Sequence, residues 1–202
     1  MLNVYDSKEN CCGCGMCAQI CAKSAIKLKE DKYGFWYPEI DQNLCTNCGA
    51  CRKNCSFNSK NTILTKECYS AVNSDDLQLS MSASGGVFSA LAYAFITDKG
   101  SVCGAAMELD NGNVTVKHIF TDSLRDLLRL QGSKYVQSYT AETFYKVLAY
   151  LKEGRKVLFS GTPCQVAAMK TYVGNQYSDL FYTIDIICHG VPSKKIFEDY
   201  IQ

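Results

Sequence analysis

Two short stretches decide the fold of the first third of the chain: residues 11–21 read CCGCGMCAQIC, and residues 45–55 read CTNCGACRKNC. Both contain four cysteines with the spacing C-x2-C-x2-C-x3-C. Three thiolates on so tight a loop can bind three corners of a cubic iron–sulfur cluster, and in two-cluster ferredoxins the fourth cysteine ligates the other cluster. The repeat therefore predicts a ferredoxin-like module with two [4Fe–4S] clusters.

The same spacing predicts which cysteines bind each cluster. Cluster 1 is expected to take Cys11, Cys14, Cys17 and Cys55. Cluster 2 is expected to take Cys45, Cys48, Cys51 and Cys21. Structural zinc, the main alternative, prefers two separated C-x2-C pairs and fits these runs of four poorly. Cys12 lies in the first loop outside this spacing, and we interpret it as a small packing residue.

Composition narrows the class of protein. The chain has 202 residues, of which 47% are hydrophobic and 20% charged, and its net charge is +1. These values are typical of a folded globular chain without a basic surface for nucleic acid. The longest apolar stretch, residues 86–96, is too short to cross a membrane, and no signal peptide is present, so we expect a cytoplasmic protein. Nine of the 13 cysteines fall within residues 11–55, which in the cytoplasm indicates metal or redox chemistry rather than disulfides.

The remaining sequence predicts a second domain of a different class. Residues 25–40 predict a hairpin that completes an α+β ferredoxin-like module at 1–58, and the polar residues 56–62 are interpreted as a linker. From 65 to 202 we expect an α/β domain with a partly parallel sheet, because strands at 156–160 and 181–187 are each followed by a helix. Residues 101–107 and 114–120 predict a further hairpin. We also expect a strand at 68–73, with Cys68 in the core, and a helix at 122–131.

Two cysteines and two loops of the second domain suggest a ligand site. Cys164 and Cys188 follow the two parallel strands, so both are expected at the carboxyl edge of the sheet, where open α/β sheets bind ligands. Cys164 also begins a helix, which lowers a thiol pKa, and it is either a metal ligand, a nucleophile or a core residue. The turn at 84–86 could bind a phosphate or cap a helix, and in the loop at 132–138 Lys134 could pair with a phosphate and Tyr135 could stack on a ring.

Four motifs follow the ferredoxin-like module in a specific order: SASGGVFSALA (82–92), LQGSKYVQS (130–138), VLFSGTPCQVAAMK (157–170) and IDIICHGVPS (184–193). In order and wording they resemble the coenzyme F420 hydrogenase/dehydrogenase beta-subunit family. The resemblance implies an iron–sulfur flavoprotein oxidoreductase, found in anaerobes. Such a protein passes electrons between clusters and FAD, and on to a hydride acceptor or donor such as coenzyme F420 or another small molecule.

The resemblance also implies site residues and a partner. The FAD pocket would be lined by Ser84, Gly85, Gly86, Gly132, Ser133, Lys134, Tyr135 and Gln137. Cys164 and Cys188 would ligate a third [4Fe–4S] cluster. The electron-transfer partner would be a ferredoxin-like protein or another subunit. Family members usually continue with a further cysteine pair, so we expect this chain to be truncated after Gln202.

Two other functions remain open from the sequence. The chain could be a pure ferredoxin-type electron carrier whose second domain only serves for docking. It could also be a thiol enzyme that uses Cys164, with the clusters acting as a redox sensor. No catalytic side chain is assigned, because in a flavoprotein the cofactor supplies the chemistry.

Overall fold

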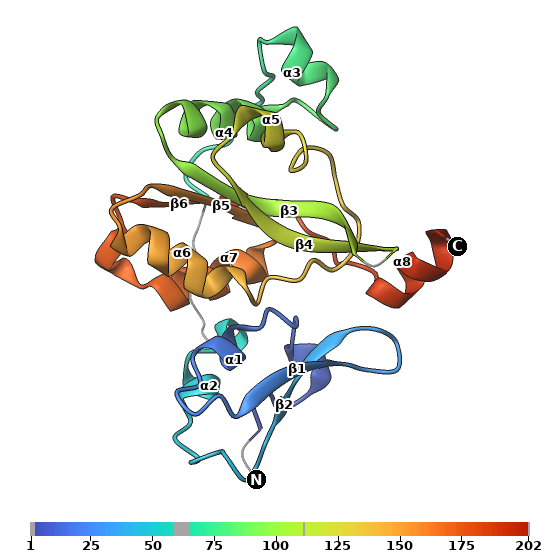
Figure 1. The fold of residues 1–202 in the computed structure, drawn as a ribbon, viewed down its shortest axis with the longest axis vertical. Coiled ribbons are helices and arrows are strands. Elements are labelled where there is room, and N and C mark those ends of the chain that lie inside the picture. Colours follow the sequence, from blue (N-terminus) through green and yellow to red (C-terminus); the bar gives the residue numbers. More distant parts are fainter. Residues whose placement is uncertain (1–2, 59–64, 111, 202) are drawn as a thin grey trace.

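The computed structural model describes residues 3–58, 65–110 and 112–201, and it shows two parts stacked along the long axis of the molecule (Figure 1). The N-terminal part contains a two-stranded antiparallel sheet in which Ile26 pairs with Ile40. Each cysteine loop leads into a short helix directly after a glycine in the left-handed region, Gly15 at φ 80° and Gly49 at φ 74°. This equivalence confirms the internal repeat. The elements are η1 (Lys8–Asn10), α1 (Met16–Gln19), β1 (Ile26–Glu30), β2 (Trp36–Ile40), α2 (Ala50–Lys53) and η2 (Ser56–Asn58).

The second part is built on a four-stranded mixed sheet with the order β4-β3-β5-β6. Its strands are β3 (Ser101–Asp110), β4 (Asn113–Thr121), β5 (Val157–Gly161) and β6 (Phe181–Asp185). β3 and β4 form the predicted antiparallel hairpin, whereas β3 and β5, and β5 and β6, are parallel. Every residue of β5 is buried, as expected for a central strand covered on both faces. The predicted α/β domain with a partly parallel sheet is therefore confirmed.

Helices cover both faces of this sheet (Figure 1). On one face, α4 and α5 pack through a core that includes Ala92, Leu127 and Leu158. On the other face, α6 and α7 pack through a larger core that includes Phe144 and Phe159. The helices are α3 (Asp76–Ser80), α4 (Val87–Thr97), α5 (Leu124–Leu127), α6 (Thr143–Lys152), α7 (Pro163–Val173), η3 (Asn175–Tyr177) and α8 (Lys194–Ile201).

The N-terminal part is docked on the α6/α7 face through its first cysteine loop. Met16 at the end of that loop is 2% exposed and belongs to the same core as Phe144. The Thr140 hydroxyl donates to the carbonyl oxygen of Cys14 at 3.0 Å, and the Trp36 and Tyr139 rings lie 5.5 Å apart. These contacts fix the position of the first cysteine loop relative to the sheet.

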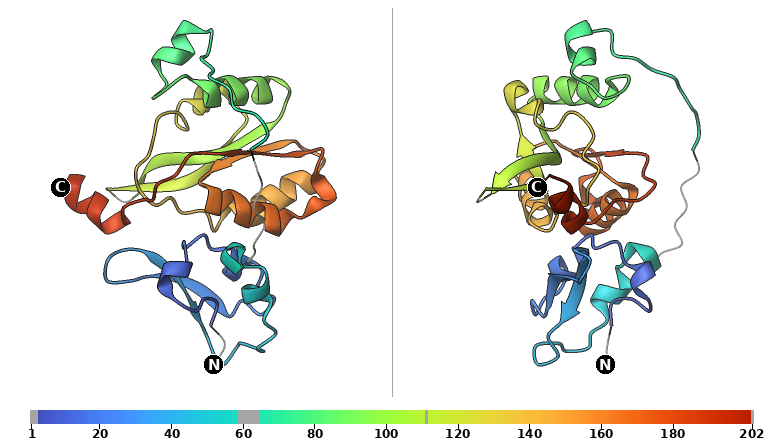
Figure 2. Two further views of the ribbon diagram at one scale, coloured as in Figure 1. Left: turned by 180° about the vertical axis from the view of Figure 1, so that it is seen from behind. Right: turned by 90° about the vertical axis from the view of Figure 1, so that its right-hand side faces the viewer.

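Three details differ from the sequence-based expectations. Residues 68–73 form no strand, and Cys68 is exposed rather than part of the core. Residues 65–75 run along the outside of the second part towards α3 (Figure 2), and their alternating pattern has no strand to pair with there. The helix expected at 122–131 is only α5, because Leu127 is buried while Leu124 and Leu128 face solvent. The linker at 56–62 lies partly outside the described residues, and its first three residues form η2.

Candidate functional site

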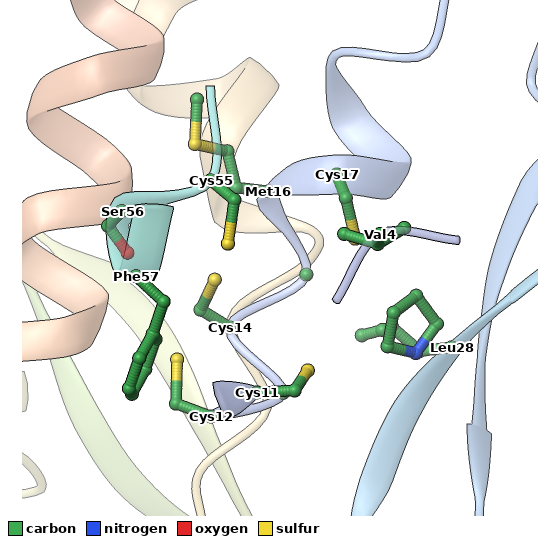
Figure 3. A pocket seen from close by; sticks show the side chains of 13 residues that line it. Val4, Cys11, Cys12, Cys14, Met16, Cys17, Leu28, Cys55, Ser56 and Phe57 are labelled. Carbon is green, nitrogen blue, oxygen red and sulfur yellow. The ribbon is translucent and has the colours of Figure 1, made fainter. Parts of the chain in front are cut away.

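The sulfurs predicted to bind cluster 1 surround one pocket (Figure 3). The pocket is lined by all four of them: Cys11, Cys14, Cys17 and Cys55. Burial, together with the neighbouring thiols of Cys14 and Cys55, raises the pKa of Cys11 to about 11. The loop therefore concentrates thiols that a positive metal centre would hold as thiolates.

The sulfurs predicted to bind cluster 2 are less enclosed than those of the first set, although Cys21 and Cys51 pack in one small core with Cys17. Burial raises the pKa of Cys51, and the nearby thiols of Cys21 and Cys48 add to the rise. Cys48 is exposed. The backbone N–H of Ala25 donates to the sulfur of Cys21 at 3.3 Å. The structure thus brings together members of both predicted sets, and ligation itself stays a prediction.

The donor chemistry of both loops fits iron–sulfur clusters. Backbone N–H groups near the sulfurs favour their thiolate forms: those of Gly13, Ala18 and Arg52 lower the pKa of Cys11, Cys17 and Cys51, and that of Ala25 donates to the sulfur of Cys21. Such N–H···S bonds stabilise thiolates and tune the potential of a cluster. Among the described residues, no three His, Cys, Asp or Glu side chains converge closely enough for a single metal ion. A [4Fe–4S] cubane instead binds each of its four cysteines at a different corner. The four cysteines of the first set line one pocket, which is compatible with this arrangement.

Cys12 has a position that the sequence did not reveal. Its thiol lies close to those of Cys14 and Cys164, and their interaction raises the pKa of Cys12 and lowers the pKa of the other two, that of Cys164 to about 6. Cys12 is therefore more than a packing residue. It connects the cluster-1 loop with the first turn of α7, where Thr162 and Gln165 form a capping box.

A cavity of about 620 Å³ lies between the cluster-1 loop and the carboxyl edge of β5 and β6. A volume of this size is ordinary for a cofactor site. Its wall includes all eight residues predicted for the FAD pocket: Ser84, Gly85, Gly86, Gly132, Ser133, Lys134, Tyr135 and Gln137. The three cysteines in the wall are Cys12, Cys164 and Cys188. Residues from five separate segments of the chain thus face one space.

The two ends of this cavity differ in chemistry. At one end, α4 begins after Gly86, which has φ 70°, and the turn at 84–86 precedes it. Lys134 is half-buried, and burial lowers its pKa to about 8. At the other end, the cavity touches Cys12 and Gly13 of the cluster-1 loop. An elongated ligand with anionic groups at one end would fit this polarity.

His118 is a cavity residue that the sequence analysis did not single out. It lies on β4, its ring stacks on Phe159 at 5.2 Å, and its Nε2 is 3.0 Å from the carbonyl oxygen of Ser160. Burial lowers its pKa to about 4, so the ring is neutral near pH 7. A lone histidine in a strand of alternating residues gives no local signal of this role, because the cavity forms only when β4 pairs with distant segments.

Comparison with known proteins identifies both parts of the chain. Residues 10–59 match the model of the 4Fe-4S dicluster domain. Residues 154–202 match the model of the C terminus of the coenzyme F420 hydrogenase/dehydrogenase beta subunit. Through residues 154–202, the second part of the chain belongs to the coenzyme F420 hydrogenase/dehydrogenase beta-subunit family. Its N-terminal module makes this family member an iron–sulfur protein.

One curated protein and one solved structure are similar to this chain. An uncharacterized ferredoxin of Methanocaldococcus jannaschii is 35% identical over 58 residues, which cover 29% of this chain and 74% of the ferredoxin. A chain in the structure of the F420-reducing [NiFe] hydrogenase complex of Methanosarcina barkeri superposes with a TM-score of 0.53 at 19% identity. That match covers 64% of this family member and 46% of the hydrogenase chain, so this protein spans about half its length. At this identity the match shows a shared fold.

None of the helices in residues 3–58, 65–110 and 112–201 has the length and hydrophobicity needed to span a bilayer.

Proposed function

We propose that this protein is an FAD-dependent iron–sulfur oxidoreductase with a ferredoxin-like domain at 1–58 and a flavin domain at 65–202. The proposal depends mainly on one observation. The cavity that contains all eight expected FAD residues also touches the loop expected to hold cluster 1. A flavin bound there would be next to a one-electron carrier, which is the arrangement that flavin–cluster electron exchange needs.

Specific residues would hold the flavin. The backbone N–H groups of Ser84–Gly86 and the start of α4 offer donors to a phosphate. Lys134 can add a positive charge, since it lines the cavity and its ammonium donates to the backbone oxygen of Gln131 at 2.7 Å. Tyr135 is 81% exposed and lines the cavity, so it could close over a ring system. When bound, FAD would exchange an electron pair with a hydride donor or acceptor, such as coenzyme F420, and single electrons with the clusters.

The expected third [4Fe–4S] cluster is part of this proposal. Cys164 and Cys188 both line the cavity; the Thr162 hydroxyl lies 3.1 Å from the Cys164 sulfur, and the backbone N–H of Gly190 donates to the Cys188 sulfur at 3.4 Å. Cys188 is exposed. Two cysteines supply half of the ligands of a cubane. The partner in electron transfer would be a ferredoxin-like protein or another subunit, and the site of action the cytoplasm.

The test is cofactor content. The complete protein is purified without oxygen, and iron, sulfide and flavin are quantified. We expect about eight irons per chain from the two clusters, or about twelve with the third, together with one FAD. Eight irons without flavin, even after incubation with FAD, would contradict the flavoprotein and favour the pure electron carrier.

A further inference from the structure

Gln137 connects the cluster-1 loop with the cavity through one amide group. Its Nε2 donates to the carbonyl oxygen of Cys12 at 3.1 Å, across 125 positions of the sequence. A carbonyl can only accept, so this bond identifies which end of the amide is nitrogen. Its backbone N–H donates to the carbonyl oxygen of Pro192 at 3.3 Å, which holds the loop in place.

The other end of the Gln137 amide has no partner. Its Oε1 is buried and accepts no hydrogen bond from the residues that the structure describes, although the side chain lines the cavity. Buried polar atoms without partners are rare in native proteins, because each costs the free energy of its desolvation. Such an atom beside a ligand cavity indicates a bond that the ligand completes.

A second cavity residue, His118, also has a buried polar atom without a hydrogen-bond partner among the described residues. His118 is 6% exposed, and its Nε2–H donates to Ser160, which leaves Nδ1 as an acceptor. That Nδ1 also has no partner in the described part of the chain. Both open positions are acceptors, so a ligand can satisfy either of them only with an N–H or O–H donor, and Gln137 lies at the end of the cavity next to the cluster-1 loop.

This end is where a redox-active ring should lie. Gln137 is bonded to Cys12, which contacts the sulfur of Cys14 in the cluster-1 set. Electron exchange with cluster 1 requires the ring rather than the phosphates to be near that loop. The oxidised isoalloxazine ring carries a single N–H, the imide N3–H.

We propose that Gln137 is a positioning residue whose Oε1 accepts a hydrogen bond from the flavin imide N–H, while its Nε2 holds the cluster-1 loop. This inference rests on the proposed function, because it requires flavin in the cavity. One side chain then fixes both redox groups relative to each other.

The test compares binding of FAD with binding of N3-methyl-FAD, which lacks the imide N–H. Dissociation constants are measured by flavin fluorescence on the complete, cluster-loaded chain. Wild-type protein should bind FAD about tenfold more tightly than N3-methyl-FAD, the effect of about one hydrogen bond. Gln137→Met, of similar length but without the acceptor, should bind both flavins equally.

Two control variants separate positioning from folding. Gln137→Glu keeps an acceptor and should keep the preference for FAD, although it loses the bond to Cys12. Thr140→Val removes the bond from Thr140 to Cys14, outside the cavity wall, and should also keep the preference.

The outcomes are distinct. If Gln137→Met retains the wild-type preference, or if the wild type has none, the role of Gln137 is wrong while the flavin site stands. If the wild-type protein binds neither flavin, the proposed function fails and this inference fails with it.

Discussion

The two cysteine loops have identical spacing but different surroundings. The first loop is enclosed: a Cβ at Gly13 would lie 2.5 Å from the Trp36 carbonyl oxygen and 2.7 Å from Gln137 Nε2. The second loop is open: a Cβ at Gly49 would meet no described atom within 4 Å, and Cys48 is exposed. The repeat therefore provides two similar cysteine loops with different surroundings. Under the proposed function, cluster 1 would exchange electrons with a flavin in the cavity, and cluster 2 with an external protein.

Iron removal should have the largest effect, because it should destabilise the N-terminal module and not the second domain. The N-terminal module has a small buried cluster of its own, formed by Val4, Ile26 and Cys51, whereas the second domain has two larger cores. Metal binding in such small modules supplies most of the folding free energy. Chelation should therefore unfold the module and leave the second domain folded. Hydrogen exchange measures this: the Ile26–Glu30 amides should lose protection and the Val157–Gly161 amides should keep it.

A module that kept the protection of Ile26–Glu30 after complete iron removal would contradict the assignment of the clusters as its structural core.

One glycine variant in each cysteine loop should separate the two loops. Gly13 and Gly49 both have positive φ, 65° and 74°, so alanine strains either by about 1–2 kcal/mol. Gly13→Ala also clashes with Trp36 and Gln137, which should add about 1–3 kcal/mol. The free energy of unfolding, from denaturant titration of the cluster-loaded protein, gives both costs. Equal losses in the two variants would mean that the first loop is not enclosed as described.

The affinity for FAD should depend on pH through Lys134. Burial lowers its pKa to about 8, so the ammonium is present at pH 7 and is lost as the pH rises above 8. An anionic phosphate favours the charged form, and FAD affinity should therefore fall by about tenfold between pH 7 and pH 9. Titration calorimetry at several pH values measures this. Lys134→Met should bind more weakly and lose this dependence; an unchanged profile would contradict the role of Lys134.

Removing the ion pair between the two parts should have the smallest effect on the free energy of unfolding. Lys194 Nζ lies 3.6 Å from Glu30 Oε1, and both side chains are about one-third exposed, 32% and 37%. Such pairs contribute at most about 1 kcal/mol. Lys194→Ala should therefore change the free energy of unfolding far less than Gly13→Ala does. A larger loss would place the main docking contact at α8 instead of the first cysteine loop.

The sequence predicted what depends on local spacing. Ligand spacing within 11–21 and 45–55, the turn at Gly86 and the strand–helix units at β5 and β6 are all encoded over a few residues. The contact between Cys12 and Cys164 joins positions 152 apart, and no local pattern encodes it. His118 and Thr140 acquire their roles in the same way. The prediction for Cys68 was wrong for the opposite reason. The alternating pattern of its segment predicted a strand, but no neighbouring strand lies beside it in the fold.

The most direct test of the central claim measures the response of each cluster to FAD. Cys14→Ser and Cys48→Ser assign the paramagnetic resonance signals of clusters 1 and 2 in the reduced, complete protein. Midpoint potentials are then measured by redox titration, with and without FAD. We predict that FAD shifts the potential of cluster 1, which borders the cavity, and leaves that of cluster 2 unchanged. A shift confined to cluster 2, or no shift in either, would contradict the account.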